Sequence, residues 1–149
     1  MLSASEEIGL SAEQAGDVDS WKIGSVRVLV AEDDSDLRNA VREALLMKGF
    51  VVNSASDGAK AAVLAALEEY DVIISDVRMP GMSGIDLARS VRSVARPPYV
   101  ILMTAYPEWY HRANHAEVGL VLRKPVSLAR LAYLVENAAR RRSDEADAP

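Results

Sequence analysis

The sequence of 149 residues has no cysteine, which excludes disulfide bonds and thiolate chemistry. No apolar run approaches the roughly 20 residues that a membrane-spanning helix needs. The first residues also lack the basic segment and the following apolar segment of a secretory signal. These absences predict a cytoplasmic protein that does not have the membrane as a partner.

A broad basic surface is missing as well. The net charge is −5, and residues 1–25 account for most of it with five acidic residues and one lysine, whereas residues 26–139 carry a net charge of only −1. Direct binding to nucleic acid is therefore not expected. The run Arg140-Arg141-Arg142 is interpreted as a set of cations at a helix end, where they face the negative end of the helix dipole.

The composition is that of one folded domain, with 50% hydrophobic and 26% charged residues. We expect a flexible N-terminal extension over residues 1–25, one domain over residues 26–142 and a flexible C-terminal tail over residues 143–149. Since no further domain fits after residue 142, the chain is expected to be either a stand-alone domain or a piece of a longer protein. Its acidic, alanine-rich ending favours a natural terminus.

Five short apolar segments alternate with helical patterns. The expected strands are Val26–Ala31, Phe50–Ser54, Val72–Ser75, Tyr99–Met103 and Leu120–Leu122. Several are apolar at consecutive positions, which indicates burial on both faces, as in a parallel sheet. The expected helices span about 37–48, 58–69, 84–94, 107–117 and 128–140, and the fourth is predicted to be short because it lacks a clear apolar stripe. The pattern predicts a doubly wound α/β domain with its ligand at the carboxyl ends of the strands.

Acidic residues follow two of these strands. Glu32, Asp33 and Asp34 come directly after the first strand, and Asp76 comes directly after the third. Carboxylates packed together cost on the order of a few kcal/mol unless a cation neutralises them, and oxygen ligands favour Mg²⁺. The alternative for the acidic run is that Asp34 or Ser35 caps the next helix while the other acids favour its positive end.

Two further strand ends supply a hydroxyl and a cation. Thr104 follows the fourth strand, and Lys124 follows the fifth. A metal held by carboxylates, a hydroxyl donor and an ammonium group together suit a phosphoryl site, in which one carboxylate attacks phosphorus and becomes an aspartyl phosphate. Each residue alone is unremarkable at a strand end, but four such matches in one chain order are far more specific.

This combination resembles the receiver domain of two-component response regulators, over roughly Val26–Arg140. The matching motifs are Val28-Leu29-Val30-Ala31-Glu32-Asp33-Asp34, Asp76-Val77-Arg78-Met79-Pro80-Gly81-Met82-Ser83-Gly84, Met103-Thr104-Ala105 and Lys124-Pro125. The resemblance implies a flavodoxin-like fold, in which a five-stranded parallel sheet of order 2-1-3-4-5 has helices on both faces.

The resemblance also implies a role for each site residue. Asp76 would be the phosphoacceptor, Thr104 the switch hydroxyl and Lys124 the phosphoryl-binding cation, followed by a Lys124-Pro125 bond that receivers usually keep cis. The ligands of the Mg²⁺ cofactor would be Asp33 directly, Glu32 through a coordinated water, Arg78 through its backbone carbonyl, and Asp76. The phosphoryl donor would be a histidine kinase or a histidine phosphotransfer protein. Such a chain is not an enzyme in the usual sense, because it catalyses only its own phosphorylation and dephosphorylation.

The sequence departs from the receiver pattern at the step after phosphorylation. Receivers usually carry Tyr or Phe three residues before the conserved lysine, and its ring moves when the threonine hydroxyl is drawn to the phosphate, whereas this chain has Val121. We hypothesise that the aromatic residues of Tyr106-Pro107-Glu108-Trp109-Tyr110 take over part of this readout or form a partner surface. The alternative is that they only pack the short fourth helix onto the sheet.

Two other functions stay open at this level. A degenerate receiver would bind its partner independently of phosphorylation. Val121 and the short fourth helix favour this function, and the complete set of site residues opposes it. Asp34-Ser35-Asp36 resembles the motif of aspartate-nucleophile phosphatases of the haloacid dehalogenase type, in which two acids stand two residues apart just after the first strand. In this chain the motif lies one or two residues further along the sequence. The sequence does not identify the cognate kinase, the output protein or the oligomeric state, which could be a homodimer.

Overall fold

The structure is a computed structural model that describes residues 25–114 and 118–146. The predicted N-terminal extension lies outside the described residues, apart from Ser25. Along the chain the elements are β1 (Arg27–Ala31), α4 (Ser35–Met47), β2 (Val51–Ala55), α5 (Gly58–Leu67), β3 (Val72–Asp76), α6 (Gly84–Ser90), η1 (Val91–Ser93), β4 (Tyr99–Thr104), α7 (Pro107–Asn114), β5 (Leu120–Arg123) and α8 (Leu128–Ala146). Among the described residues, no helix combines the length and apolar character needed to cross a membrane.

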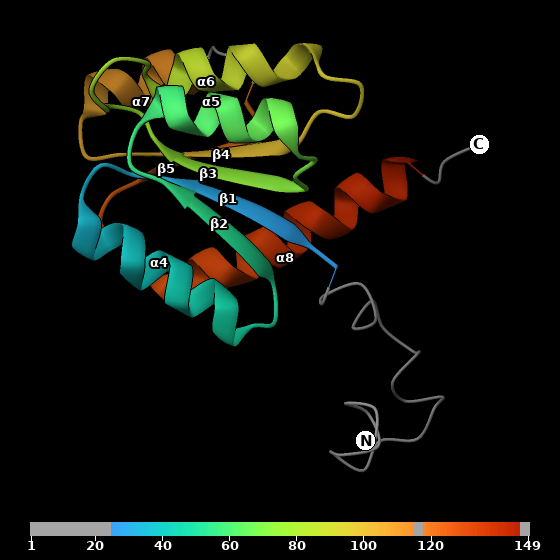
Figure 1. The fold of residues 1–149 in the computed structure, drawn as a ribbon. Coiled ribbons are helices and arrows are strands. Elements are labelled where there is room, and N and C mark those ends of the chain that lie inside the picture. Colours follow the sequence, from blue (N-terminus) through green and yellow to red (C-terminus); the bar gives the residue numbers. More distant parts are fainter. Residues whose placement is uncertain (1–24, 115–117, 147–149) are drawn as a thin grey trace, which may run out of the picture.

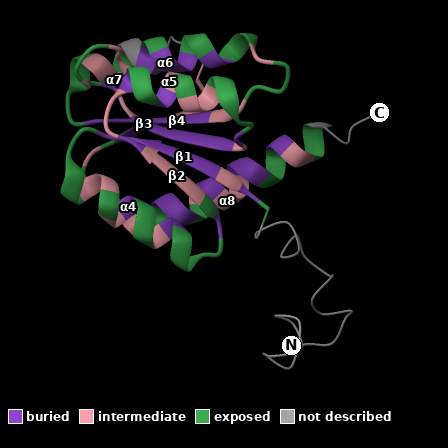
Figure 2. Ribbon diagram, in the orientation of Figure 1, coloured by how far each residue is buried: buried purple, intermediate pink, exposed green. Residues whose placement is uncertain are grey.

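The five strands form one parallel sheet in the order β2-β1-β3-β4-β5, so the predicted fold class is confirmed. Helices α4 and α8 cover one face, and α5, α6 and α7 cover the other (Figure 1). Each face has its own apolar core, and the central strands are buried on both sides (Figure 2). This double burial explains why the strands read as continuous apolar runs rather than as alternating patterns.

Most of the predicted elements are found within one or two residues of their expected bounds. The described part of the fourth helix, α7, spans Pro107–Asn114, and the rest of the range expected for this helix, residues 115–117, lies outside the described residues. The third helix is interrupted, because α6 ends at Ser90 and a 3₁₀ turn, η1, completes the segment. Burial of Leu87 and Val91 keeps this segment on the sheet although its helical geometry changes.

The end of the last helix was predicted wrongly. Helix α8 continues to Ala146, so residues 143–146 belong to the helix and the expected tail begins too early. Arg142 is therefore not at a helix end, and only 7% of it is exposed. Its guanidinium lies 2.7 Å from Asp71 Oδ1 and donates hydrogen bonds of 2.9 Å to the carbonyl oxygens of Arg96 and Pro97. The carboxylate and the two carbonyl groups accept hydrogen bonds from the buried guanidinium, and these bonds compensate for its lost hydration.

Candidate functional site

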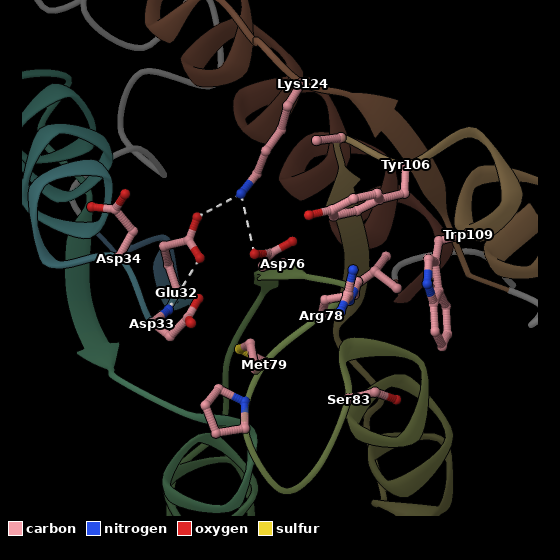
Figure 3. A pocket seen from close by; sticks show the side chains of 13 residues that line it. Glu32, Asp33, Asp34, Asp76, Arg78, Met79, Ser83, Tyr106, Trp109 and Lys124 are labelled. Atoms are coloured by element: carbon pink, nitrogen blue, oxygen red, sulfur yellow. Dashed lines mark hydrogen bonds and ion pairs between the residues drawn. The ribbon is translucent and has the colours of Figure 1, made fainter.

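Three carboxylates meet at the carboxyl edge of the sheet. Glu32 and Asp33 follow β1, and Asp76 is the last residue of the neighbouring strand β3. One carboxylate oxygen from each lies within 4.8 Å of the other two (Figure 3). The parallel arrangement of the strands causes this gathering, because neighbouring parallel strands end on the same side of the sheet.

Lys124 supplies a positive charge to this cluster from the end of β5. Its Nζ lies 2.8 Å from Glu32 Oε1 and 3.1 Å from Asp76 Oδ2, as the dashed lines in Figure 3 show. The backbone N–H of Lys124 donates a 2.8 Å hydrogen bond to the carbonyl oxygen of Thr104, which fixes the lysine beside β4. The Lys124-Pro125 peptide bond is cis, as the resemblance implied.

The cluster has more negative charge than its one lysine neutralises. Burial, aided by the charge of Asp76, raises the pKa of Glu32 to about 7, although the hydrogen bond from Lys124 lowers it. Burial lowers the pKa of Lys124, but the hydrogen bond to Glu32 and the charge of Asp76 outweigh this effect and raise it above its ordinary value. The cluster therefore favours the charged form of Lys124 and disfavours the charged form of Glu32, and a further cation would counteract the second effect.

The donor set of this cluster fits a hard divalent cation. All three side chains offer carboxylate oxygens, which are the ligands that Mg²⁺ prefers. Glu32 is buried, whereas Asp33 is exposed and Asp76 is accessible in part, so an ion can reach the cluster from solvent. Glu32, Asp33 and Asp76 could therefore hold a metal ion, and Arg78, a further predicted ligand through its carbonyl, lines the same pocket.

Thr104 is the last residue of β4 and is 1% exposed. Its Oγ1 accepts a 3.1 Å hydrogen bond from the backbone N–H of Tyr106. Thr104 is not among the residues that line the open pocket above the carboxylates, although the next residue, Ala105, is. In this structure the hydroxyl therefore tethers the loop that leads into α7.

The open pocket above Asp76 has a volume of about 690 Å³. On the side of α7 its wall includes Tyr106 and Trp109, and the Arg78 guanidinium stacks 4.6 Å from the centre of the Tyr106 ring. Trp109 also packs against the apolar core on the α5 and α6 face, which agrees with the packing alternative for that residue. The hypothesis that these aromatics carry the readout is compatible with their position and stays a prediction.

The loop after Asp76 is shaped by two glycines. Gly81 has a φ of +76°, a conformation that favours glycine. A Cβ at Gly84 would lie 2.2 Å from the carbonyl oxygen of Asp76, so only glycine lets α6 begin this close to the end of β3. Ser83 caps α6 by accepting a 3.1 Å hydrogen bond from the backbone N–H of Asp86.

Asp34 has the capping role that was the alternative for the acidic run. Its Oδ1 accepts hydrogen bonds from the backbone N–H groups of Asp36 and Leu37, at 2.9 and 3.1 Å. Asp36 lies in the first turn of α4, where an acid complements the positive helix end. The phosphatase-like motif Asp34-Ser35-Asp36 is thus the beginning of a helix, while Glu32 and Asp33 remain with the site.

Two contacts at the site were missed by sequence reasoning. Arg38, one turn into α4, donates a 2.8 Å hydrogen bond to the carbonyl oxygen of Glu32. The stacking of Arg78 on Tyr106 joins the loops after β3 and β4. The residues at the strand ends do not indicate either contact, because both contacts depend on the rotamer that a long arginine side chain adopts.

Comparisons with known proteins agree with this geometry. A family model described as response regulator receiver domain matches residues 28–136. The chain is 38% identical to the transcriptional regulatory protein PdtaR of Mycobacterium tuberculosis over 118 residues, which cover 77% of this chain and 57% of PdtaR. It is 34% identical to the probable transcriptional regulatory protein SilR of Salmonella typhimurium over 118 residues, covering 78% of this chain and 52% of SilR.

Solved structures give the same result. The receiver domain of the Francisella response regulator 1452 is 29% identical and superimposes with a TM-score of 0.71, covering 78% of this chain and 98% of that domain. The chain therefore matches a whole receiver domain, and it spans about half the length of the curated relatives.

Proposed function

The chain belongs to the response regulator receiver domain family, and on this premise we propose that Asp76 accepts a phosphoryl group and thereby switches partner binding. The observation that carries the proposal is the meeting of Asp76 with Glu32, Asp33 and Lys124 at one sheet edge. Such a site offers a carboxylate nucleophile together with charges that balance a phosphoryl group.

The proposed transfer uses the side chains as they are placed. A carboxylate oxygen of Asp76 forms the bond to phosphorus while the bond between phosphorus and the donor's imidazole nitrogen breaks. The bonding pair goes to that nitrogen, and the imidazole leaves as the neutral ring with the proton that its other nitrogen already carried. Lys124, already 3.1 Å from Asp76 Oδ2, pairs with the phosphoryl oxygens. The hydroxyl of Thr104 donates a hydrogen bond to another of these oxygens.

The proposed cofactor is Mg²⁺, held by Glu32, Asp33, Asp76 and the backbone carbonyl of Arg78. When bound, the ion neutralises negative charge on the carboxylates and on the phosphoryl group. The three-to-one excess of carboxylates over lysine at this edge supports the assignment. The raised pKa of Glu32 supports it as well, since a carboxyl that is hard to ionise alone gains most from a nearby cation.

The proposed donor is a histidine kinase or a histidine phosphotransfer protein, as for receivers in general. The output is a change in the binding of an output protein or of a neighbouring domain. The relatives PdtaR and SilR are named transcriptional regulatory proteins, so control of transcription is one output open to this chain. Beyond its own phosphorylation and dephosphorylation, the domain is not proposed to catalyse a reaction.

The signal is proposed to leave the site through the link between Thr104 and Tyr106. A hydroxyl that turns to the phosphoryl group gives up its present bond from the Tyr106 N–H, and this frees the loop that carries Tyr106 and Trp109. Val121 is buried in the core and cannot make the excursion of an aromatic ring.

Tryptophan fluorescence tests this route. In a Trp21→Phe background, the emission of Trp109 should change when beryllofluoride and Mg²⁺ are added. Thr104→Ala should abolish the change while beryllofluoride still binds. An unchanged Trp109 emission in the Trp21→Phe protein with Thr104 intact would reject this route. Trp109 would then have only the role of packing α7 onto the sheet.

Phosphorylation itself is tested with acetyl phosphate and Mg²⁺, followed by intact-mass measurement. We expect one phosphoryl adduct on the wild-type chain and none on Asp76→Asn. If neither protein is modified, the proposed phosphorylation switch is rejected, and a receiver that binds its partner independently of phosphorylation becomes the better account. If both are modified, the acceptor is misassigned.

A further inference from the structure

A groove of about 250 Å³ lies at the amino edge of the sheet, between the end of α5 and the segment that follows η1. Most of its wall is apolar, and Leu67 in that wall is 75% exposed. The apolar and aromatic residues of this amino-edge groove are Ala65, Ala66, Leu67, Tyr70, Val94, Ala95 and Pro98, and the charged ones are Glu68, Glu69 and Arg96. Covering such a wall with another apolar group is favourable, because it removes apolar surface from water.

The size of the groove limits what can enter it. Its volume lies below the roughly 300–1,000 Å³ that is usual for pockets that bind small molecules. A partner protein would cover a much wider area, on the order of 800 Å² on each side of a stable interface. The groove is therefore suited to a single large side chain.

The start of β1 brings the chain's own N-terminal residues to this groove. Arg27, the first residue of β1, forms an ion pair with Glu68, and its guanidinium lies 5.7 Å from the centre of the Tyr70 ring. Glu68 and Tyr70 both line the groove. Trp21 precedes Arg27 by six residues, which span up to about 20 Å, so its side chain can reach the groove. Attachment to the same chain also gives it an effective concentration on the order of millimolar, which a separate molecule would have to match.

We propose that the indole of Trp21 occupies the amino-edge groove of its own chain. The ring covers the apolar wall, and its N–H donates a hydrogen bond to the carboxylate of Glu68 or Glu69. Both carboxylates already pair with arginines, but an ionised carboxylate has about four acceptor positions and can receive a further donor. Ile23 lies closer to β1, but its side chain has no donor for these carboxylates. The flexible part of the predicted N-terminal extension would then end before Trp21.

Fluorescence of the full chain tests this docking. The chain has two tryptophans, so Trp109→Phe leaves Trp21 as the only one. Its emission should be that of a buried indole, at shorter wavelength than in urea, and acrylamide should quench it several-fold less than in urea. Leu67→Asp should shift the emission to longer wavelength and restore quenching. Val63→Asp, at a 59% exposed position on α5 outside the groove, should change neither, and circular dichroism should show that both variants fold.

The concentration dependence separates docking within one chain from insertion into a second copy. The emission should be the same at about 1 µM and at about 100 µM chain, a range over which weak complexes dissociate. A shift to shorter wavelength only at the higher concentration would overturn the proposal. Emission of a fully exposed indole at both concentrations, or equal effects of Leu67→Asp and Val63→Asp, would overturn it too.

Disulfide trapping tests the location, and the absence of natural cysteine makes it specific. Ser20→Cys combined with Ala95→Cys should form an intramolecular disulfide on mild oxidation, faster than Ser20→Cys combined with Met47→Cys. Met47 is a matched control because it is 88% exposed and lies near the start of β1, where the Val51 N–H donates a 2.9 Å hydrogen bond to the Val26 carbonyl.

Adding Trp21→Ala should abolish the preference for the groove, because the indole is the proposed anchor. Equal trapping at both positions, or a preference that survives Trp21→Ala, would contradict the proposal. Asp76→Asn should leave the Trp21 emission and the trapping unchanged, so a failure here is separate from a failure of the phosphorylation proposal.

Discussion

The two edges of the sheet each gather charged residues, but they differ in charge balance. The carboxyl-edge cluster consists of Glu32, Asp33, Asp76 and Lys124, with three carboxylates and one cation. The amino-edge cluster lies where β3 and β4 begin and consists of Glu69, Asp71, Arg96 and Arg142, with two carboxylates and two guanidinium groups. One cluster has an excess of negative charge, whereas the charges of the other are balanced.

The pKa shifts follow this difference. Burial raises the pKa of Glu32 at the carboxyl edge to about 7. At the amino edge, hydrogen bonds, first from Arg96 and then from Arg142, lower the pKa of Glu69 below its ordinary value. A balanced cluster holds structural elements together, while an unbalanced one of the same residue types is suited to binding a cation and a phosphoryl group.

The largest expected effect comes from removing Lys124, the one cation of the carboxyl-edge cluster. Lys124→Ala should slow phosphorylation by acetyl phosphate by roughly 10²–10³-fold, because it removes a preorganised charge from the developing phosphoryl site. Initial rates measured by intact mass would test this. Lys48→Ala, at the exposed residue that follows the C-terminal end of α4, is the control. Equal rates for Lys124→Ala and the wild type would show that the Lys124 ammonium is not used in transfer.

The next effect concerns the amino edge and stability. Arg142→Ala should lower the free energy of unfolding by about 3 kcal/mol, since Asp71 and two carbonyl groups would lose a buried partner. Urea denaturation would measure this, with the exposed Arg141→Ala as control. Below its melting temperature, Arg142→Ala should still be phosphorylated. A loss of phosphorylation in the folded variant would contradict the claim that the amino-edge cluster contributes to stability alone.

A smaller effect is the pH dependence, which should have opposite signs at the two edges. The pKa of Glu32 is raised from 4.5, so the folded state keeps a proton that the unfolded state has lost, and stability falls as pH rises from 4.5 to about 7. This contribution is at most about 1.4 kcal/mol per pH unit. The pKa of Glu69 is lowered, so its contribution is present above pH 4.5 and is lost as pH falls through its folded pKa.

Urea denaturation of the metal-free chain between about pH 3 and 8 would separate these contributions, since the Glu69 contribution is lost below pH 4.5 and the Glu32 contribution above it. Glu32→Gln should remove the loss of stability toward pH 7, and saturating Mg²⁺ should reduce it. Glu69→Gln should instead change only the acidic limb. An unchanged pH profile in Glu32→Gln would contradict the electrostatic account of the carboxyl edge.

The sequence predicted the fold because its signals are local. Consecutive apolar residues in β1, β3 and β4 indicated double burial, and the strand ends then placed Glu32, Asp76, Thr104 and Lys124 at one edge by topology alone. The break between α6 and η1 could not be predicted in this way, since the burial of Val91 is compatible with either helical geometry.

The amino-edge cluster escaped prediction because its members are far apart in the chain. Arg142 and Asp71 are 71 residues apart, and the sequence presents Arg142 only as one of three consecutive arginines. Docking of α8 on the sheet decides which of the three is buried, and tertiary packing of this kind leaves no periodic signal. The same limit applies to Arg78 and Tyr106, whose stacking depends on side-chain direction.

Locating the phosphoryl group tests the central claim most directly. Borohydride reduction of the acetyl phosphate-treated chain converts an aspartyl phosphate to homoserine, and peptide mass spectrometry then identifies the modified residue. The account predicts homoserine at Asp76 alone, dependent on Mg²⁺ and absent without acetyl phosphate. Homoserine at Asp33 or Asp34, or at no residue of a folded and Mg²⁺-loaded chain, would contradict it.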